Sequence, residues 1–158
     1  VNNIRVVIGA QSGSEEVLRR MNRGHTPEDV LEAESLLRRY GFGVDVDYIF
    51  GLPGETEEDI QKTISHMRKV AALGGRIHGH VFLPLPGTPL SLAPPGKVKA
   101  ELRKAVNSLL GRGKVFGSWM AQEVLAREIA MLRDKGFILV TPKRAEEFLP
   151  HLPRCKTP

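Results

Sequence analysis

The sequence has little of what secreted, membrane-spanning or metal-cluster proteins need. Its one cysteine, Cys155, can neither close an internal disulfide nor ligate a cluster alone, which predicts a reducing, cytoplasmic location. No run of about 18 apolar residues occurs, so we expect no membrane span. No basic or apolar leader precedes the apolar run 4–8, and we therefore interpret the start at Val1 as a cut through a larger protein.

The common phosphate-binding fingerprints are also missing. Neither GxxxxGK[ST] nor GxGxxG occurs, which disfavours a P-loop and a dinucleotide site. An anion at the helix start over residues 12–16 stays open as an alternative, although that loop has no basic residue. Ser14 followed by Glu15 and Glu16 is also typical of an ordinary helix N-cap.

What the chain does have is the composition of a globular protein with an uneven charge. Of its 158 residues 41% are hydrophobic and 26% charged, enough for one domain with a sizeable core. Residues 97–158 hold 13 Lys/Arg against 6 Asp/Glu, whereas residues 1–96 hold 10 against 12. The basic C-terminal part indicates a nucleic acid or another acidic partner, or simply a solvated helical face without aromatic platforms.

Strand and helix patterns alternate along the first 96 residues. Apolar strands are predicted over 4–10, 43–50 and 76–83, and helices over 15–22, 26–40 and 57–73. Thr26-Pro27 is typical of a helix start, and Gly41 and Gly74 of helix ends. Strands that begin 39 and 33 residues apart leave room for right-handed crossover helices, so the sheet should be parallel.

Residues 97–158 form the second predicted part, a basic and mostly helical C-terminal extension. Helices are expected over 98–110, 121–135 and 142–149, a loop over 111–118 and a short strand over 137–141. We therefore divide the chain into residues 1–96 and residues 97–158.

Alternation along each predicted strand separates an apolar from a partly polar face. The polar set is Arg5, Val7, Gly9, Gln11; Asp45, Asp47, Ile49, Gly51; and His78, His80, Phe82. A parallel sheet covered by helices on both faces would be apolar on both. The fold class predicted is α/β, with three parallel βα units forming half of a partial TIM-type barrel whose lumen carries a ligand. A face exposed to solvent would have the same pattern.

Three motifs at the predicted strand ends resemble the radical S-adenosylmethionine (SAM) enzymes. GAQSGS at 9–14 with MNRGHT at 21–26 resembles their fourth strand, DYIFGLPGET at 47–56 their fifth, and FLPLPGTPL at 82–90 their sixth. The most similar groups are the MiaB-like methylthiotransferases and the cobalamin-binding radical SAM proteins. The resemblance covers residues 4–90, the C-terminal half of such a domain.

The resemblance implies a (βα)6 partial barrel that holds a [4Fe-4S] cluster and cleaves SAM reductively. The CxxxCxxC segment that binds the cluster is absent from this sequence. We therefore expect a fragment of a radical SAM oxidoreductase, inactive alone, whose partners in the parent are the rest of its own domain and a reductant. The alternative is a non-catalytic α/β binding module with a basic tail for a protein or RNA partner. Whether this chain is itself an enzyme stays open.

Within the resemblance, six residues are expected to bind the cofactor. Gln11 and Arg23 match positions near the methionine carboxylate of SAM, Asp47 one at the ribose hydroxyls and Ile49 one on adenine. Ser12 and Gly51 complete this set. Arg23 as a surface cation at a helix end and Asp47 as an acceptor for backbone groups are the open alternatives.

Asp45, His78 and His80 are expected to face the substrate. The pair His78-x-His80 places two imidazoles on one strand face, but no third ligand is apparent, so no metal site is predicted. Glu55 is expected to cap the following helix. The substrate is not indicated, but the helical residues 97–158 favour the cobalamin-binding branch, with cobalamin in the parent, over MiaB-like enzymes with a C-terminal RNA-binding β-domain.

Overall fold

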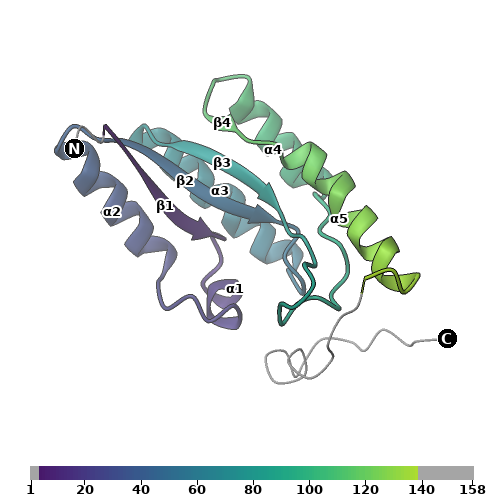
Figure 1. Ribbon diagram of the computed structural model, residues 1–158. Coiled ribbons are helices and arrows are strands. Elements are labelled where there is room, and N and C mark those ends of the chain that lie inside the picture. Colours follow the sequence, from purple (N-terminus) through teal and green to yellow (C-terminus); the bar gives the residue numbers. More distant parts are fainter. Residues whose placement is uncertain (1–3, 139–158) are drawn as a thin grey trace.

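Residues 4–138 are described by the computed structural model, and they form a four-stranded parallel sheet with packed helices (Figure 1). Neighbouring strands follow one another in the order β1-β2-β3-β4. This confirms the α/β class and the parallel sheet, which are consistent with part of a TIM-like barrel. In chain order the elements are β1 (Arg5–Gln11), α1 (Glu15–Arg20), α2 (Pro27–Arg39), β2 (Gly43–Phe50), α3 (Glu57–Leu73), β3 (Arg76–Val81), α4 (Ala100–Leu110), β4 (Val115–Phe116) and α5 (Trp119–Asp134).

Local signals account for the ends of the longer helices. Thr26 and Asp29 form a reciprocal capping box at the start of α2, and Thr56 and Asp59 form another at the start of α3. Gly74 ends α3 in the left-handed conformation, with φ 102°. Because these caps are encoded within a few residues, the predicted bounds of β2 and α3 are confirmed.

The segment predicted as a loop over 111–118 contains a short strand. Val115 and Phe116 pair in parallel with Ile77 and His78 of β3, so α4 is a crossover helix between β3 and β4. Two residues are too few for a periodic signal, which is why the prediction of a loop was wrong here. Of the predicted 97–158 extension, the described part is mostly helical, and the division at residue 96 stays a prediction.

Helix α5 covers the end of β3 beyond the short strand β4. Its side chain Gln122 Oε1 accepts a hydrogen bond of 2.8 Å from the backbone N–H of Val81, and Trp119 at its start is 2% exposed. A side chain thus replaces a strand partner for an edge amide.

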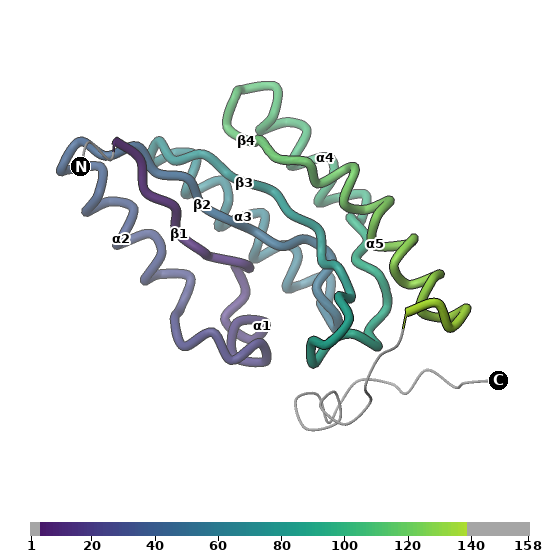
Figure 2. The backbone as a smooth tube through the Cα atoms, in the orientation of Figure 1, coloured from purple at the N-terminus to yellow at the C-terminus, as the bar shows by residue number. Residues whose placement is uncertain are grey.

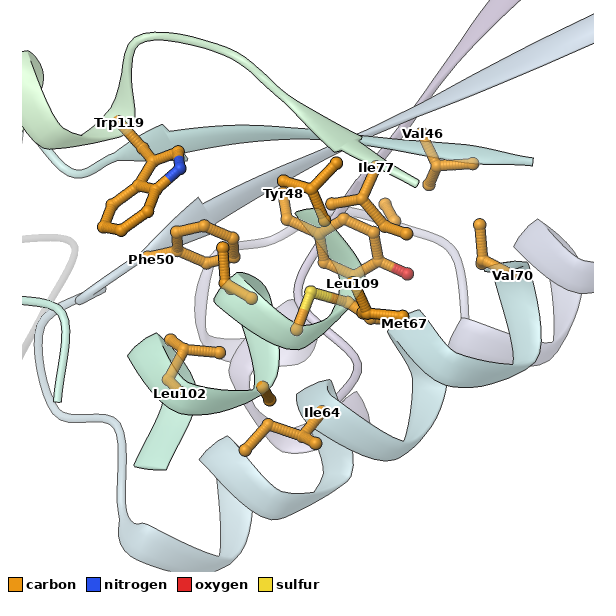
Figure 3. Packing of buried hydrophobic residues seen from close by; sticks show 14 of the residues in the cluster. Val46, Tyr48, Phe50, Ile64, Met67, Val70, Ile77, Leu102, Leu109 and Trp119 are labelled. Atoms are coloured by element: carbon orange, nitrogen blue, oxygen red, sulfur yellow. The ribbon is translucent and has the colours of Figure 1, made fainter. Parts of the chain in front are cut away.

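The main hydrophobic core lies between the apolar face of the sheet and helices α3 and α4 (Figure 3). Val46, Tyr48 and Phe50 of β2 point toward Met67 of α3 and Leu102 of α4. Each of these three β2 side chains is at most 1% exposed. The predicted two-residue alternation is therefore confirmed for β2 and β3.

Within residues 4–138 no helix is both long and apolar enough to cross a bilayer. Phe137 and Ile138 form a bend. The rest of the strand predicted over 137–141, and all of the helix predicted over 142–149, lie outside the described residues.

A buried hydrogen-bond chain ties β2 to α3 and α2. His66 Nε2 lies 2.8 Å from the carbonyl oxygen of Pro27, and His66 Nδ1 lies 2.6 Å from the hydroxyl of Tyr48. A carbonyl can only accept, so Nε2 carries the proton and Nδ1 accepts from the tyrosine. Burial lowers the pKa of His66, in agreement with this neutral ring.

Replacing Tyr48 by Phe should leave the buried His66 Nδ1 without its donor. We expect the free energy of unfolding to fall by about 1–3 kcal/mol in urea denaturation. The matched control is Tyr40→Phe, since Tyr40 is 76% exposed and its loss should change stability by less than about 0.5 kcal/mol. Equal effects of the two substitutions would contradict the buried chain.

Candidate functional site

One face of the sheet carries a row of polar side chains, which we call the polar face. It follows from in-register pairing, since Gly9 pairs with Asp47, Asp47 with His78 and Ile49 with His80. Partners in a parallel ladder point to the same side, so these residues gather on one surface. Figure 2 shows α3 behind the three long strands, on the other side.

Asp45, predicted to face the substrate, is held by two arginines. Its Oδ1 accepts from Arg5 Nη1 at 2.9 Å and from Arg76 Nε at 2.8 Å, and its Oδ2 accepts from Arg76 Nη2 at 3.0 Å. Burial alone would raise the pKa of Asp45, but the hydrogen bonds and charges of Arg76 and Arg5 lower it overall. The carboxylate joins all three long strands, and both its oxygens are engaged.

Asp47, His78 and His80 meet at the centre of the polar face. His78 Nδ1 lies 3.0 Å from Asp47 Oδ1 and 3.2 Å from His80 Nε2, and the last two atoms are 3.9 Å apart. All three side chains are about 30% exposed, at 27%, 32% and 30% respectively. Burial, followed by the neighbouring His78, lowers the pKa of His80.

Aromatic packing fixes the ring of His78. It stacks on Phe116 of β4 with centroids 4.5 Å apart and an interplanar angle of 3°. The guanidinium of Arg76 lies 4.7 Å from the centroid of Phe116. The sequence did not indicate this role of Phe116, because it depends on the short strand β4.

Gln11 and Arg23 converge on Gly9 at the carboxyl end of β1. A Cβ built on Gly9 would lie 2.6 Å from Gln11 Nε2 and 3.4 Å from Arg23 Nη2. The register shifts between Gly9 and Gln11, which pairs with Tyr48 and has φ 64°. Simple alternation therefore fails at Gln11, but its amide still reaches Gly9, whose strand partner is Asp47.

Three other predicted cofactor residues take part in packing. Ser12 is fully buried, and its hydroxyl lies 3.1 Å from Thr63 Oγ1 of α3. Gly51 has φ 72°, and a Cβ there would lie 2.5 Å from the backbone nitrogen of Lys97. Ile49 is half-buried against a small cluster that includes Leu52.

The loops after β1 and β2 are fastened to each other. Ser14 Oγ donates to Asp59 Oδ1 at 2.5 Å, and Arg20 Nη2 lies 3.5 Å from Asp59 Oδ2. Asp59 also accepts from the Thr56 amide as the N3 residue of α3. The start of one helix thus anchors the start of another, and this holds Gln11 and Arg23 near β2.

Glu55 does not cap α3 as predicted. Thr56 and Asp59 already satisfy the start of that helix, and Glu55 Oε2 instead accepts from the backbone N–H of Leu52 at 3.1 Å. Burial, reinforced by the charge of Asp59, raises the pKa of Glu55 from 4.5 to about 7.

A surface groove of about 1040 Å³ lies elsewhere, between the start of α3 and α4. Its lining includes Glu57, Lys97, Arg103 and Lys104, and none of the predicted site residues. The side chains that carry chemistry are those of the polar face, and we take that face as the candidate site.

Comparison with known proteins gives one family model and several relatives. The family model described as "Radical SAM superfamily" matches residues 1–67. "Threonylcarbamoyladenosine tRNA methylthiotransferase MtaB" of Thermotoga maritima is 31% identical over 129 residues, which is 80% of this chain and 29% of that protein. "tRNA-2-methylthio-N(6)-dimethylallyladenosine synthase" of Geobacter sulfurreducens is 38% identical over 133 residues, 83% of this chain and 28% of that protein.

An archaeal relative, "Uncharacterized protein MJ1620" of Methanocaldococcus jannaschii, is 32% identical over 106 residues, 66% of this chain and 21% of that protein. The chain thus spans less than a third of the length of these relatives. Residues 1–67 match the radical SAM superfamily model, and the chain is similar over a partial segment to the methylthiotransferases of the MiaB family. The expected cobalamin-binding branch gains no support from these matches.

The raised pKa of Glu55 predicts a pH dependence of stability. The folded chain binds this proton more tightly than the unfolded chain, so the stabilisation is complete below about pH 4.5 and is lost as the pH rises through about 7. Glu55→Gln keeps an acceptor for the Leu52 amide and does not titrate. Relative to this variant, the wild type should lose about 1–3 kcal/mol between about pH 5 and pH 8 in denaturant unfolding.

The control for this measurement is Glu58→Gln in the first turn of α3, since its side chain is 76% exposed and its described ion pair is with Lys62. It should follow the wild-type pH profile within about 0.5 kcal/mol. Parallel profiles for the wild type and Glu55→Gln would show that Glu55 does not titrate near neutral pH.

Proposed function

We propose that this chain supplies the SAM-facing wall of a radical SAM oxidoreductase. The observation that carries the proposal is the convergence of two motif residues, Gln11 and Arg23, on Gly9 at the end of β1, next to the polar face. In parallel sheets, ligands bind at the carboxyl ends of strands. The match of residues 1–67 to the radical SAM superfamily supports the assignment.

The exposed edge of the sheet supports a larger barrel in the parent protein. Among residues 4–138, β1 pairs only with β2, so its other edge is unpaired there; Val7 on this strand is 60% exposed, and Ile4 just before it is 79% exposed. Unpaired strand edges with apolar side chains are normally covered. We therefore propose that β1 pairs with a preceding strand of the parent's own radical SAM domain.

The corner at Gly9 has the donors that a SAM molecule needs. Because Gly9 has no side chain, the Gln11 amide can lie directly against the strand there, with the Arg23 guanidinium close by. A guanidinium fork binds a carboxylate through paired, charge-assisted hydrogen bonds, which suits the methionine carboxylate of SAM. We assign Gln11 and Arg23 to that group.

Asp47 and Ile49 lie farther along the polar face and suit the nucleoside. Of the two carboxylate oxygens of Asp47, Oδ1 has a hydrogen-bond partner among the described residues and Oδ2 has none. Oδ2 can therefore accept hydrogen bonds from ribose hydroxyls. Half-buried Ile49 offers an apolar contact for adenine. When bound, SAM would supply the 5′-deoxyadenosyl group. The residues of this chain orient it and neutralise its carboxylate.

The iron–sulfur cluster does not fit this chain. Three cysteine ligands are needed in the family, and the sequence holds Cys155 alone. We therefore assign cluster binding and electron transfer to other parts of the parent and none of these steps to this chain.

The test uses the full-length parent, reconstituted with iron and sulfide and reduced with dithionite. We expect SAM cleavage to 5′-deoxyadenosine. Arg23→Gln and Gly9→Ala should each weaken SAM binding about tenfold, because the first removes a charged donor and the second adds a Cβ that would displace the Gln11 amide. Equilibrium dialysis with labelled SAM measures the affinity.

Arg19→Gln is the matched control, since Arg19 is 72% exposed and its described ion pair is with Glu16 on the same helix. It should bind SAM like the wild type. Absence of SAM cleavage by the wild-type parent would contradict the enzymatic assignment. Wild-type affinity in both Arg23→Gln and Gly9→Ala would contradict the placement of SAM.

A second candidate is an RNA-binding role, favoured by relatives whose names specify tRNA and by the basic residues 97–158. If this part contacts RNA phosphates, the affinity for tRNA should fall steeply with rising salt. A filter-binding titration of the chain with tRNA at several salt concentrations distinguishes this role from the first proposal. A chain that only contributes to SAM binding would show no saturable tRNA binding.

A further inference from the structure

We propose that Asp47, His78 and His80 form a binding site for one divalent first-row transition metal ion. Their three ligand atoms all lie within 4.8 Å of one another, in the middle of the polar face. This site is separate from the cluster of the parent, and it uses the two histidines that the proposed SAM contacts leave unassigned.

The spacing of the ligand atoms matches a coordination sphere. With metal–ligand bonds of about 2.0–2.1 Å, neighbouring ligands are about 2.9 Å apart in an octahedron and about 3.4 Å apart in a tetrahedron. The three observed separations are 3.0, 3.2 and 3.9 Å. Two already match, and the third, between Asp47 Oδ1 and His80 Nε2, needs a small side-chain adjustment.

Hydrogen bonds alone cannot satisfy all three ligand atoms of this cluster. Asp47 Oδ1 and His80 Nε2 both approach the same atom, His78 Nδ1, which carries at most one proton. At best a single N–H is shared between two acceptors. A cation would accept a lone pair from each of the three atoms at once, with His78 protonated on Nε2 and His80 on Nδ1.

The sheet holds the three side chains in place before any ligand binds. Asp47 and His78 are register partners on β2 and β3, and His80 is two residues farther along β3. Stacking on Phe116 fixes the His78 ring, and Gly117 (φ 116°) leaves room for it, because a Cβ there would lie 2.9 Å from His78 Cδ2. Ligands fixed by packing lose little freedom on binding.

The ligand types select the class of metal. Two imidazoles and one carboxylate suit Zn²⁺, Co²⁺, Ni²⁺ or Fe²⁺, whereas Ca²⁺ and Mg²⁺ prefer oxygen ligands. Each side chain is about 30% exposed, so an ion can enter. Three protein ligands leave coordination positions open toward the polar face, as in metal sites that bind water or substrate.

The test measures Co²⁺ binding to the chain of residues 1–158 without SAM or iron. A Cys155→Ser background removes thiolate ligation, and purification tags are cleaved off. We expect one Co²⁺ per chain by calorimetry, with visible d–d absorption. Asp47→Asn, His78→Gln and His80→Gln should each weaken binding more than about tenfold.

His25→Gln is the matched control, a histidine outside the three-residue cluster that should leave Co²⁺ affinity unchanged. Thermal melts of the metal-free variants check folding. A second measurement needs no variant: in the wild-type chain, Zn²⁺ should shift the imidazole ¹⁵N resonances of His78 Nδ1 and His80 Nε2 and leave His66 unaffected.

Wild-type Co²⁺ affinity in His80→Gln, absence of saturable one-to-one binding, or Zn²⁺ shifts confined to other histidines would each overturn the metal site. Because no SAM is present in these measurements, such a result leaves the SAM assignment untouched. Conversely, failure of the Arg23→Gln and Gly9→Ala tests leaves the metal site standing.

Discussion

In-register parallel pairing of β1, β2 and β3 is the constraint on which the rest of the structure depends. It places Gly9, Asp47 and His78 side by side although 31 or more residues separate them along the chain. The same pairing turns Val46 and Ile77 toward the helices. A shift of one residue in either ladder would exchange the two faces, bury the polar groups and expose the core. Asp45 opposes such a shift, since its carboxylate binds arginines from both neighbouring strands.

The loops at the carboxyl ends add a second level of order. Ser14 and Asp59 join the starts of α1 and α3, while the chain of Tyr48, His66 and Pro27 ties β2 to α3 and α2. These contacts are buried and satisfied, so the loops that carry the family motifs are fixed by the scaffold rather than by a ligand. This rigidity is what a binding surface needs if little freedom is to be lost on association.

The sequence predicted features encoded by neighbouring residues and missed those encoded by distant ones. The bounds of β2 and α3 followed from strand alternation, the Thr56 cap and Gly74. Three features depend on partners far along the chain, so no local sequence pattern predicts them: the strand β4, the bulge at Gln11 and the stacking of Phe116. Glu55 was wrongly predicted to cap the start of α3, because the neighbouring Thr56 and Asp59 could fill that role equally well and do so. For Asp47, strand alternation predicted its place on the polar face, but its proximity to His78 and His80 followed only from the register of β2 and β3.

The unequal surroundings of the two Asp47 oxygens have a consequence for regulation. Oδ1 contacts the imidazole of His78, whereas Oδ2 has no hydrogen-bond partner among the described residues. Ligands bound to the two oxygens of one carboxylate share its charge, so an ion at one side withdraws electron density from the other. If a nucleoside and a metal ion both bind Asp47 as proposed, thermodynamic linkage requires that each alter the affinity of the other by the same factor. The affinity for the nucleoside would then depend on the concentration of the ion, and the reverse, through the single side chain of Asp47.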